Sequence, residues 1–372
     1  MKVWPLVGIV CVQGILLLAH WFIYHTWFAF WGSSGAVIDL ALRAAVVVLA
    51  FSFVTAALLG FRFSNPLVAT LYKIAAVWLG LLNFFFLAAC LSWLVWYALL
   101  LSPLSADAAA HRPLIAAVLY SLALAAVVYG MLNARWIRVR RVAVTLPGLP
   151  ESWRGRTALV LSDLHLGYIN GARFSRRIAA AAAPLQPDIV FLPGDIFDGS
   201  LADSHRLAAP LLKIAPPFGF FFTTGNHEEF GDAARYSDAM TGAGIRVLDN
   251  ELVTVDGLHI LGVPFSGTAP IRLRTTLQAL KPDHGQASIL LNHVPNRLPI
   301  VEEAGISLQL SGHTHGGQVF PFTWITRRAF GKFTYGLQAF GALQVYTSSG
   351  AGTWGPPMRV GTHPEMVLLT FE

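Results

Sequence analysis

The chain has 372 residues, of which 55% are hydrophobic and 12% are charged, and its mean hydropathy is +0.57. Soluble globular proteins carry about 25% charged residues, so an ordinary soluble protein is excluded. A disordered chain needs low hydrophobicity and a disulfide scaffold needs many cysteines, whereas this chain has two. Residues 1–142 carry a net charge of +7 and residues 143–372 a net charge of −1, so no nucleic acid binding is expected of the second part.

The first part of the chain contains four long intervals without a charged residue. They lie between Lys2 and Asp39, Arg43 and Arg62, Lys73 and Asp107, and Arg112 and Arg135. A helix needs about 20 apolar residues to cross a bilayer, because its backbone polar groups must pair within the helix. The alternative, four buried helices of a large soluble core, is disfavoured because the charges are confined to the gaps. We therefore predict a membrane domain over 1–141 with four transmembrane helices, at about 4–25, 41–61, 76–101 and 113–134.

Lysine and arginine gather on one side of these predicted spans. Three basic segments fall on that side: Lys2, residues 62–73 and residues 135–141. The opposite loops carry Asp39 and Asp107, with only Arg112 close to a span end. The positive-inside rule then predicts an inner or plasma membrane protein whose termini and second domain face the cytoplasm. The alternative is the reverse orientation, with the second domain outside.

From residue 142 onward the pattern changes to short apolar runs that each end in polar residues. Runs of about five apolar residues are typical of buried strands. They cover residues 157–161, 189–192, 218–222, 288–291 and 306–310. A helical stretch over 172–183 follows the first run, and residues 247–263 predict a hairpin with its turn at Asp256-Gly257. Residues 142–372 are thus predicted to form an α/β domain, in which ligands gather at the carboxyl ends of the strands.

Polar side chains with metal-binding chemistry follow five of these runs. They are Asp163, His165, Asp195, Asp198, Asn226, His227, His293, His313 and His315. Carboxylate, imidazole and amide groups without thiolate suit divalent Mn, Fe or Zn. Because residues i and i+2 of an extended chain point the same way, each of the pairs Asp163/His165 and His313/His315 is expected to converge on one centre. Each motif alone is weak evidence, but five in order, each after a predicted strand, predict a metal site.

Five short motifs carry these side chains. They are Asp163-x-His165, Gly194-Asp195-x-x-Asp198, Gly225-Asn226-His227-Glu228, Asn292-His293 and Gly312-His313-Thr314-His315. Together they resemble the motif set of the calcineurin-like binuclear metallophosphoesterases, and residues 349–359 are similar to the ending of the bacterial membrane-attached branch. The resemblance covers residues 155–370 and implies an α/β metallophosphoesterase domain of two packed sheets flanked by helices. It also implies two divalent metal ions bridged by Asp195, with Asp163, His165 and His315 at the first ion and Asn226, His293 and His313 at the second.

The same resemblance implies a metal-dependent phosphoester hydrolase that acts by direct attack of a metal-bridging hydroxide. His227 would protonate the leaving oxygen, and Asp198 would fix the tautomer of His227 and favour its protonated form. The doublet His313-Thr314-His315 favours a phosphodiesterase or pyrophosphatase over a phosphomonoesterase or protein phosphatase. Four spans would hold the site near the lipid bilayer, and the resemblance implies a lipid-linked phosphoester, such as UDP-diacylglucosamine or a phospholipid, as one candidate substrate.

A membrane sensor or transporter with a regulatory phosphoesterase-like domain is the alternative from a different class. Few charges lie inside the predicted spans, which disfavours an ion pathway, and the complete ligand set disfavours an inactive domain. No protein partner is predicted.

An unusually apolar and aromatic segment, residues 319–330, begins beside the last histidine motif and contains Arg327 and Arg328. One interpretation is a folded-back flap with both arginines in solvent. The other is that the segment enters the lipid headgroup region, where Arg327 and Arg328 bind the phosphate of a lipid or substrate.

Overall fold

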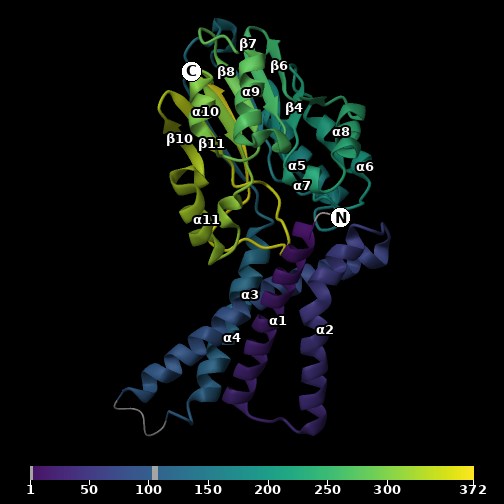
Figure 1. Ribbon diagram of the computed structural model, residues 1–372, viewed down its shortest axis with the longest axis vertical. Coiled ribbons are helices and arrows are strands. Elements are labelled where there is room, and N and C mark those ends of the chain that lie inside the picture. The colour runs from purple at the N-terminus through teal and green to yellow at the C-terminus, as the bar shows by residue number, and fades with distance from the viewer. Residues whose placement is uncertain (1–2, 103–107) are drawn as a thin grey trace. The chain divides into compact units, whose positions relative to one another are not determined.

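The computed structural model describes residues 3–102 and 108–372, which fall into two compact units (Figure 1). The first unit comprises Met1–Leu132 with Gly355–Met358, and the second comprises Asn133–Trp354 with Arg359–Glu372. Lys2 and Asp107, which bound two of the predicted uncharged intervals, lie outside the described residues.

The first unit contains four long helices: α1 Val3–Trp31, α2 Ala36–Gly60, α3 Pro66–Leu100 and α4 Arg112–Asn133. Each is long and apolar enough to cross a membrane, and each overlaps one predicted span. Helix α3 begins ten residues before its predicted start at 76, since Lys73 lies inside the helix rather than before it. Its first turn is fixed by Pro66 and by the side chain of Asn65, which accepts a hydrogen bond from the backbone N–H of Val68 at 3.0 Å.

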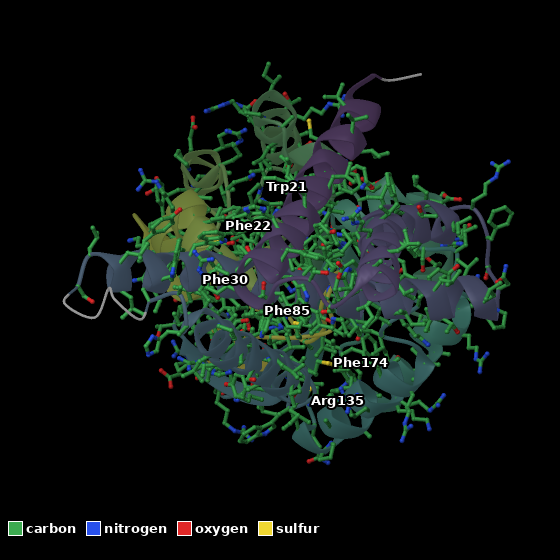
Figure 2. The ribbon with its side chains drawn as sticks, turned by 90° about the horizontal axis from the view of Figure 1, so that it is seen from below. Trp21, Phe22, Phe30, Phe85, Arg135 and Phe174 are labelled. Atoms are coloured by element: carbon green, nitrogen blue, oxygen red, sulfur yellow. The ribbon has the colours of Figure 1, made fainter. Side chains whose placement is uncertain are left out.

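Two pairs of polar side chains inside this helical unit are hydrogen-bonded to each other. The indole of Trp78 donates to His20 at 2.9 Å, and the indole of Trp93 donates to Thr26 at 2.9 Å. Figure 2 shows aromatic residues spaced along α1: Trp21, Phe22 and Phe30. Pairing removes the cost of leaving a polar group unsatisfied in apolar surroundings, so these helices suit a bilayer and indicate membrane association.

The second unit contains two six-stranded mixed sheets, which confirms the predicted fold class. The first sheet has the order β1-β12-β2-β3-β4-β5, with strands β1 Arg138–Val144, β12 Glu365–Phe371, β2 Thr157–Val160, β3 Ile189–Pro193, β4 Phe220–Thr223 and β5 Arg246–Val247. The second has the order β10-β11-β9-β8-β7-β6, with strands β10 Gly336–Phe340, β11 Leu343–Thr347, β9 Leu308–Ser311, β8 Ser288–Asn292, β7 Leu258–Val263 and β6 Glu251–Val255.

Helices flank the sheets of this unit, and both faces of the central strands are buried. The helices are α5 Ala172–Ala182, α6 Ser204–Ala208, α7 Asn226–Phe230, α8 Ala233–Gly242, α9 Pro270–Leu280, α10 Leu298–Glu303 and α11 Phe322–Phe330. Along β2, Ala158 and Val160 belong to a core shared by both sheets, whereas Leu159 packs into a second core with α5 and α8. Burial on two faces explains why the strands are continuous apolar runs rather than alternating ones.

The hairpin predicted over 247–263 is formed by β6 and β7, which pair antiparallel with Val255 opposite Leu258. Asp256 and Gly257 connect the strands with φ of 47° and 81°. Positive φ at both turn positions is the conformation that favours Asp-Gly in two-residue hairpin loops.

The α/β unit begins earlier than the boundary expected at residue 142. Strand β1 starts at Arg138 and pairs in parallel with β12, from Arg138 opposite Glu365 to Val144 opposite Phe371. Arg138, Arg140 and Arg141 suggested a basic loop beside the membrane. They belong instead to an edge strand, whose mostly exposed side chains tolerate charge.

Candidate metal centre

The seven side chains predicted as metal ligands all follow the carboxyl ends of strands. Strands β2, β3 and β4 are parallel neighbours in one sheet, and β7, β8 and β9 are parallel neighbours in the other. The residues after these ends are Asp163 and His165 from β2, Asp195 from β3, Asn226 from β4, His293 from β8, and His313 and His315 from β9. Parallel strands end at a common edge, so residues far apart in the sequence meet there.

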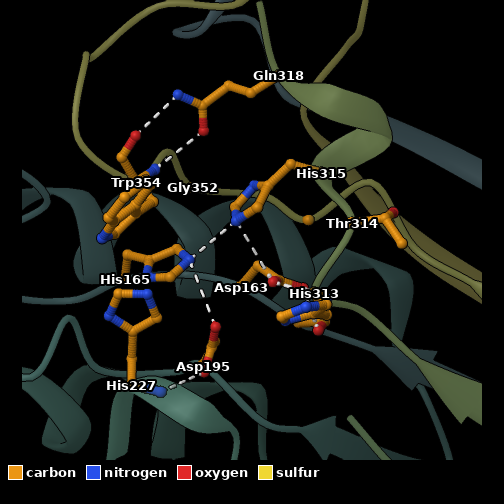
Figure 3. A network of polar contacts seen from close by, with 12 residues as sticks. Asp163, His165, Asp195, His227, His313, Thr314, His315, Gln318, Gly352 and Trp354 are labelled. Atoms are coloured by element: carbon orange, nitrogen blue, oxygen red, sulfur yellow. Dashed lines mark hydrogen bonds and ion pairs between the residues drawn. The ribbon is translucent and has the colours of Figure 1, made fainter. Parts of the chain in front are cut away.

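Asp163, His165 and His315 form one group of possible ligands (Figure 3). The Nε2 atoms of His165 and His315 are 2.9 Å apart, and Nε2 of His315 lies 3.4 Å from Oδ1 of Asp163. All three side chains are buried, and their ligand atoms lie within 4.8 Å of one another. Two imidazoles and a carboxylate therefore face a common point from two sheets.

Asp195, His293 and His313 form a second group with the same spacing limit of 4.8 Å. Oδ2 of Asp195 lies 3.1 Å from Nε2 of His293, and it also lies 3.9 Å from Nε2 of His165 in the first group. Nδ1 of His313 is 2.8 Å from Oδ1 of Asn226, which brings the amide oxygen to this group. One carboxylate thus faces both groups, which is the position that the resemblance assigns to Asp195.

The backbone brings these pairs together in a different way from the one predicted. Asp163, His165, Asp195, His313 and His315 have φ between 45° and 69°, the left-handed region. An extended chain was expected to align Asp163 with His165 and His313 with His315, but both pairs lie in left-handed loops beyond the strand ends. Non-glycine residues in this region cost about 1–3 kcal/mol each and cluster at functional sites.

Tight backbone approach makes two glycines of the motifs necessary. A Cβ at Gly312 would collide with the side chains of Ser162 and Asp163, and a Cβ at Gly225 would collide with Asp195. Only glycine leaves room for both carboxylates where they now lie.

Glu228, the last residue of the motif Gly225-Asn226-His227-Glu228, is fully buried under the site. Its carboxylate accepts hydrogen bonds from the backbone N–H groups of Asp195 at 2.9 Å, Phe197 at 2.8 Å and Gly225 at 2.7 Å. Burial, together with the nearby Asp195 carboxylate, raises the pKa of Glu228 to about 8. Glu228 therefore ties the loop after β3 to the loop after β4.

The donor set fits a divalent cation. Nδ1 of His293 lies 2.8 Å from the carbonyl oxygen of Pro193, so Nδ1 carries a hydrogen and Nε2 points toward the Asp195 carboxylate. Within the described part of the chain, this Nε2 is buried without a hydrogen bond. Nε2 and a carboxylate oxygen 3.1 Å apart attract a positive charge between them, either a proton or a metal ion, and oxygen and nitrogen ligands suit Mn, Fe or Zn.

The pKa values of most histidines in this ligand set are lowered, which keeps the imidazoles neutral and able to bind a cation. Burial and neighbouring positive charge lower the pKa of His165 and His315 well below the usual range, and burial lowers the pKa of His313 to about 4. Burial raises the pKa of Asp163 to about 6. Burial opposes a charge on His293, but the Asp195 carboxylate overrides it and raises the pKa of His293 to about 10. Burial also opposes a charge on Asp195, but His293 overrides it and lowers the pKa of Asp195, so this carboxylate stays ionised.

His227 lies at the mouth of this site, half-buried. Its backbone N–H donates to Oδ1 of Asp195 at 2.9 Å, and its ring packs edge-on against His165 with centroids 4.7 Å apart. The half-exposed ring of Trp354 lies 5.6 Å from the His227 ring. Gln318 fixes Trp354 through two hydrogen bonds, donating to its carbonyl at 2.9 Å and accepting from its N–H at 3.0 Å (Figure 3).

The predicted contact between the Asp198 carboxylate and His227 is wrong, because the backbone carbonyl of Asp198 makes the contact instead. Nδ1 of His227 lies 3.2 Å from the backbone carbonyl of Asp198. The Asp198 carboxylate instead accepts from the backbone N–H groups of Tyr168 at 3.1 Å and Ser200 at 2.9 Å. Because these backbone N–H groups bind the carboxylate, Asp198 orients His227 through its main-chain carbonyl.

Arg359, the last residue of the segment 349–359, lies against the loop that contains His315. The side chain is fully buried and donates to the carbonyls of His315 at 3.1 Å, Gly350 at 3.1 Å and Gly352 at 2.6 Å. Its Nη2 also lies 3.1 Å from Nδ1 of His315. The apolar, glycine-rich sequence around Arg359 indicates that this arginine could be buried, but it does not show that the side chain contacts the loop of His315.

Residues 322–330 of the aromatic segment 319–330 form helix α11, whose large apolar side chains are well exposed, whereas Val319 is buried. Phe322, Trp324 and Ile325 are 49%, 69% and 60% exposed. Arg327 and Arg328 lie in the last turn of the helix, and the site described above does not include them. Exposed apolar rings beside two arginines are typical of a helix that lies at a lipid surface.

Comparison with known proteins agrees with this geometry. The family model described as "Calcineurin-like phosphoesterase" matches residues 156–317. A Danio rerio protein named "Transmembrane protein with metallophosphoesterase domain" is 30% identical over 330 residues, which cover 81% of this chain and 72% of the relative. An uncharacterized metallophosphoesterase of Aquifex aeolicus is 31% identical over 66% of this chain and 95% of its own length. One of Campylobacter jejuni is 30% identical over 63% of each chain.

The chain belongs to the calcineurin-like phosphoesterase family. Membership confirms the predicted class of metal-dependent phosphoester hydrolases. The family uses divalent metal ions, and the two groups of side chains around Asp195 are residues that could hold them.

Proposed function

We propose that this protein is a membrane-anchored phosphohydrolase with a binuclear metal centre, acting on phosphodiester or pyrophosphate bonds. The observation that carries the proposal is the position of the Asp195 carboxylate, 3.1 Å from His293 and 3.9 Å from His165, between two groups of possible ligands. Asp163, His165 and His315 would hold one metal ion, and Asn226, His293 and His313 the other.

Two divalent cations in such a site supply an activated water and neutralise the phosphoryl oxygens. The chain's own contribution is positioning and proton transfer. His227 faces the same centre from its mouth and, held at Nδ1 by the Asp198 carbonyl, would donate a proton to the leaving oxygen. Trp354, fixed by Gln318 beside His227, would border the leaving group.

A lipid-linked substrate and a cytoplasmic active site are part of this proposal. The four apolar helices support a site close to a bilayer, as does the name of the transmembrane relative from Danio rerio. Basic segments on one side of the helices support the cytoplasmic orientation. Helix α11, with its exposed rings, would contact the headgroup region, and Arg327 and Arg328 would bind lipid or substrate phosphate.

The His227→Ala variant tests the proposed proton donor. We expect kcat for diphenyl phosphate, whose poor phenolate leaving group needs a proton, to fall by about 100-fold or more, because general acid catalysis contributes on that order. Metal content, measured by elemental analysis, should be unchanged. His205→Ala is the matched control, since His205 is exposed on α6 and outside the site. A His227→Ala variant as fast as wild type would remove His227 from the mechanism.

Charge reversal at Arg327 and Arg328 tests the proposed role of α11. We expect activity on lipid-linked phosphoesters in vesicles to fall by about tenfold, since each arginine that meets a phosphate contributes a charge-assisted hydrogen bond. Activity on bis(p-nitrophenyl) phosphate should change far less, because this soluble diester needs no lipid surface. Equal losses on both substrates would count against the lipid contact.

A further inference from the structure

A cavity of about 590 Å³ lies in the second unit, behind the loop that carries the last two predicted ligands. Its walls come from α11, the turn Gly331–Thr334, Gln338 of β10 and residues 361–363, and Gly316 of the ligand loop reaches it. Among the described residues, none of the seven predicted ligands lines this cavity. Its volume lies in the usual range for small-molecule sites, about 300–1,000 Å³.

Two cations face this cavity. They are Arg327 and Lys332, and no acidic side chain of the described chain lines the walls. The Arg327 guanidinium makes no hydrogen bond or ion pair within residues 3–102 and 108–372, whereas Lys332 spends one donor on the carbonyl of Ala339 at 2.8 Å. Free guanidinium and ammonium donors on walls without carboxylates favour an anion, and a guanidinium matches the oxygens of a phosphate in particular.

The remaining walls combine uncharged donors with aromatic surface. Thr323 and Gln338 add a hydroxyl and an amide. Tyr335 contributes its ring, because its hydroxyl donates to the buried carboxyl of Glu365 at 2.7 Å. Trp324 contributes a second ring that is 69% exposed. These walls suit a phosphate with an apolar substituent better than a bare inorganic ion.

The cavity shares structural elements with the metal-ligand loop. Thr314, between His313 and His315, donates its hydroxyl to the carbonyl of Thr334, a cavity residue, at 2.7 Å. A Cβ at Gly317 would collide with the backbone of Thr323, another cavity residue, so α11 begins in direct contact with this loop. A ligand in the cavity would therefore touch the same framework that positions His315.

We propose that this cavity is a binding site for an organic phosphate with an apolar substituent, separate from the metal centre. The site does not depend on hydrolysis at the metal centre and adds to the proposed function. Such a ligand could be a phospholipid headgroup or a soluble phosphate ester, and both present the same charged oxygens beside an apolar group.

Phenylphosphonate is a suitable probe because its carbon–phosphorus bond resists hydrolysis by phosphoesterases. We would titrate it by calorimetry into the full chain in phosphatidylcholine nanodiscs. Binding is expected in the wild type and in the Asp195→Asn variant, because Asp195 does not line the cavity. Arg327→Gln and Lys332→Gln should each weaken binding by about tenfold or more, the effect of losing a charge-assisted hydrogen bond.

Arg176→Gln is the matched control, since Arg176 is exposed on α5 and outside the cavity walls. The proposal is overturned if Arg176→Gln weakens binding as much as Arg327→Gln, or if Asp195→Asn abolishes binding. Competition by phosphatidate in the nanodisc would identify a lipid headgroup as the ligand, and competition by soluble phenyl phosphate alone would identify a small ester. A protein that binds the probe without hydrolysing any ester would support this site while refuting the proposed function.

Discussion

The Asp195→Asn variant is expected to lose almost all hydrolytic activity and to retain less than half of the bound metal. Asp195 is the one described carboxylate that faces both groups of possible ligands, 3.1 Å from His293 and 3.9 Å from His165. Asparagine keeps the shape of the side chain but removes its negative charge, which would offset the repulsion between two metal ions. Metal ions supply several kcal/mol of transition-state stabilisation, so a loss of about 1,000-fold or more in kcat is expected.

The fold of this variant should persist, because the asparagine oxygen can still accept the hydrogen bond that Asp195 takes from the backbone of His227 at 2.9 Å. Thermal unfolding of the full chain in detergent checks this point. Asp238→Asn serves as the control, since Asp238 is exposed on α8 and distant from the strand ends. Unchanged metal content and unchanged rate in Asp195→Asn would refute a shared carboxylate.

The parts of the structure that follow from local pattern could be predicted from the sequence. Uncharged intervals gave the four helices, because crossing a bilayer demands length and apolarity alone. The strands around Leu159 and Val190 were predictable because burial on both faces forbids polar residues. The convergence of Asp163, Asp195 and His293 was predictable because all three follow parallel strands that end at one edge.

Features that depend on tertiary contacts could not be predicted from the sequence. Left-handed φ at Asp163 and His313 has no sequence signal, since aspartate and histidine usually adopt other conformations. His227 contacts the backbone carbonyl of Asp198 rather than the carboxylate, because the carboxylate binds the N–H groups of Tyr168 and Ser200. The sequence alone does not show which N–H groups lie within its reach. Likewise, Glu228 is the same residue type as solvated glutamates, and only its burial against three backbone N–H groups shows its role.

The different surroundings of Arg327 and Arg328 at the surface could not be predicted from the sequence either. Adjacent residues of a helix point about 100° apart, so two neighbouring arginines seldom share an environment. The structure places Arg327 in a cavity wall and leaves Arg328 outside it. Sequence reasoning treated them as one pair, because charge type alone gives no direction.

Arg359→Leu is expected to destabilise the second unit by about 3 kcal/mol or more and to reduce metal binding. The guanidinium is fully buried and satisfies three carbonyl oxygens, those of His315, Gly350 and Gly352. Leucine fills part of the space but donates nothing, so three hydrogen bonds from a charged donor are lost, each worth about 1.5–3 kcal/mol. The carbonyls of His315 and Gly350 keep only their backbone donors, the N–H groups of Gln318 and Glu365. Because one of these carbonyls belongs to His315, the loss should reach the metal site as well.

Urea unfolding and metal analysis of the full chain measure the two effects. Arg176→Leu is the control, since Arg176 is exposed on α5 and carries the same charge. Arg359→Lys should recover only part of the stability, because one ammonium group lacks the planar fork that lets the guanidinium reach carbonyls on both sides. If Arg359→Leu is as stable as Arg176→Leu, the carbonyls find other donors, and the ending of the chain does not brace His315. A stable Arg359→Leu variant that still loses metal would instead assign the residue to positioning His315 through the 3.1 Å contact with Nδ1.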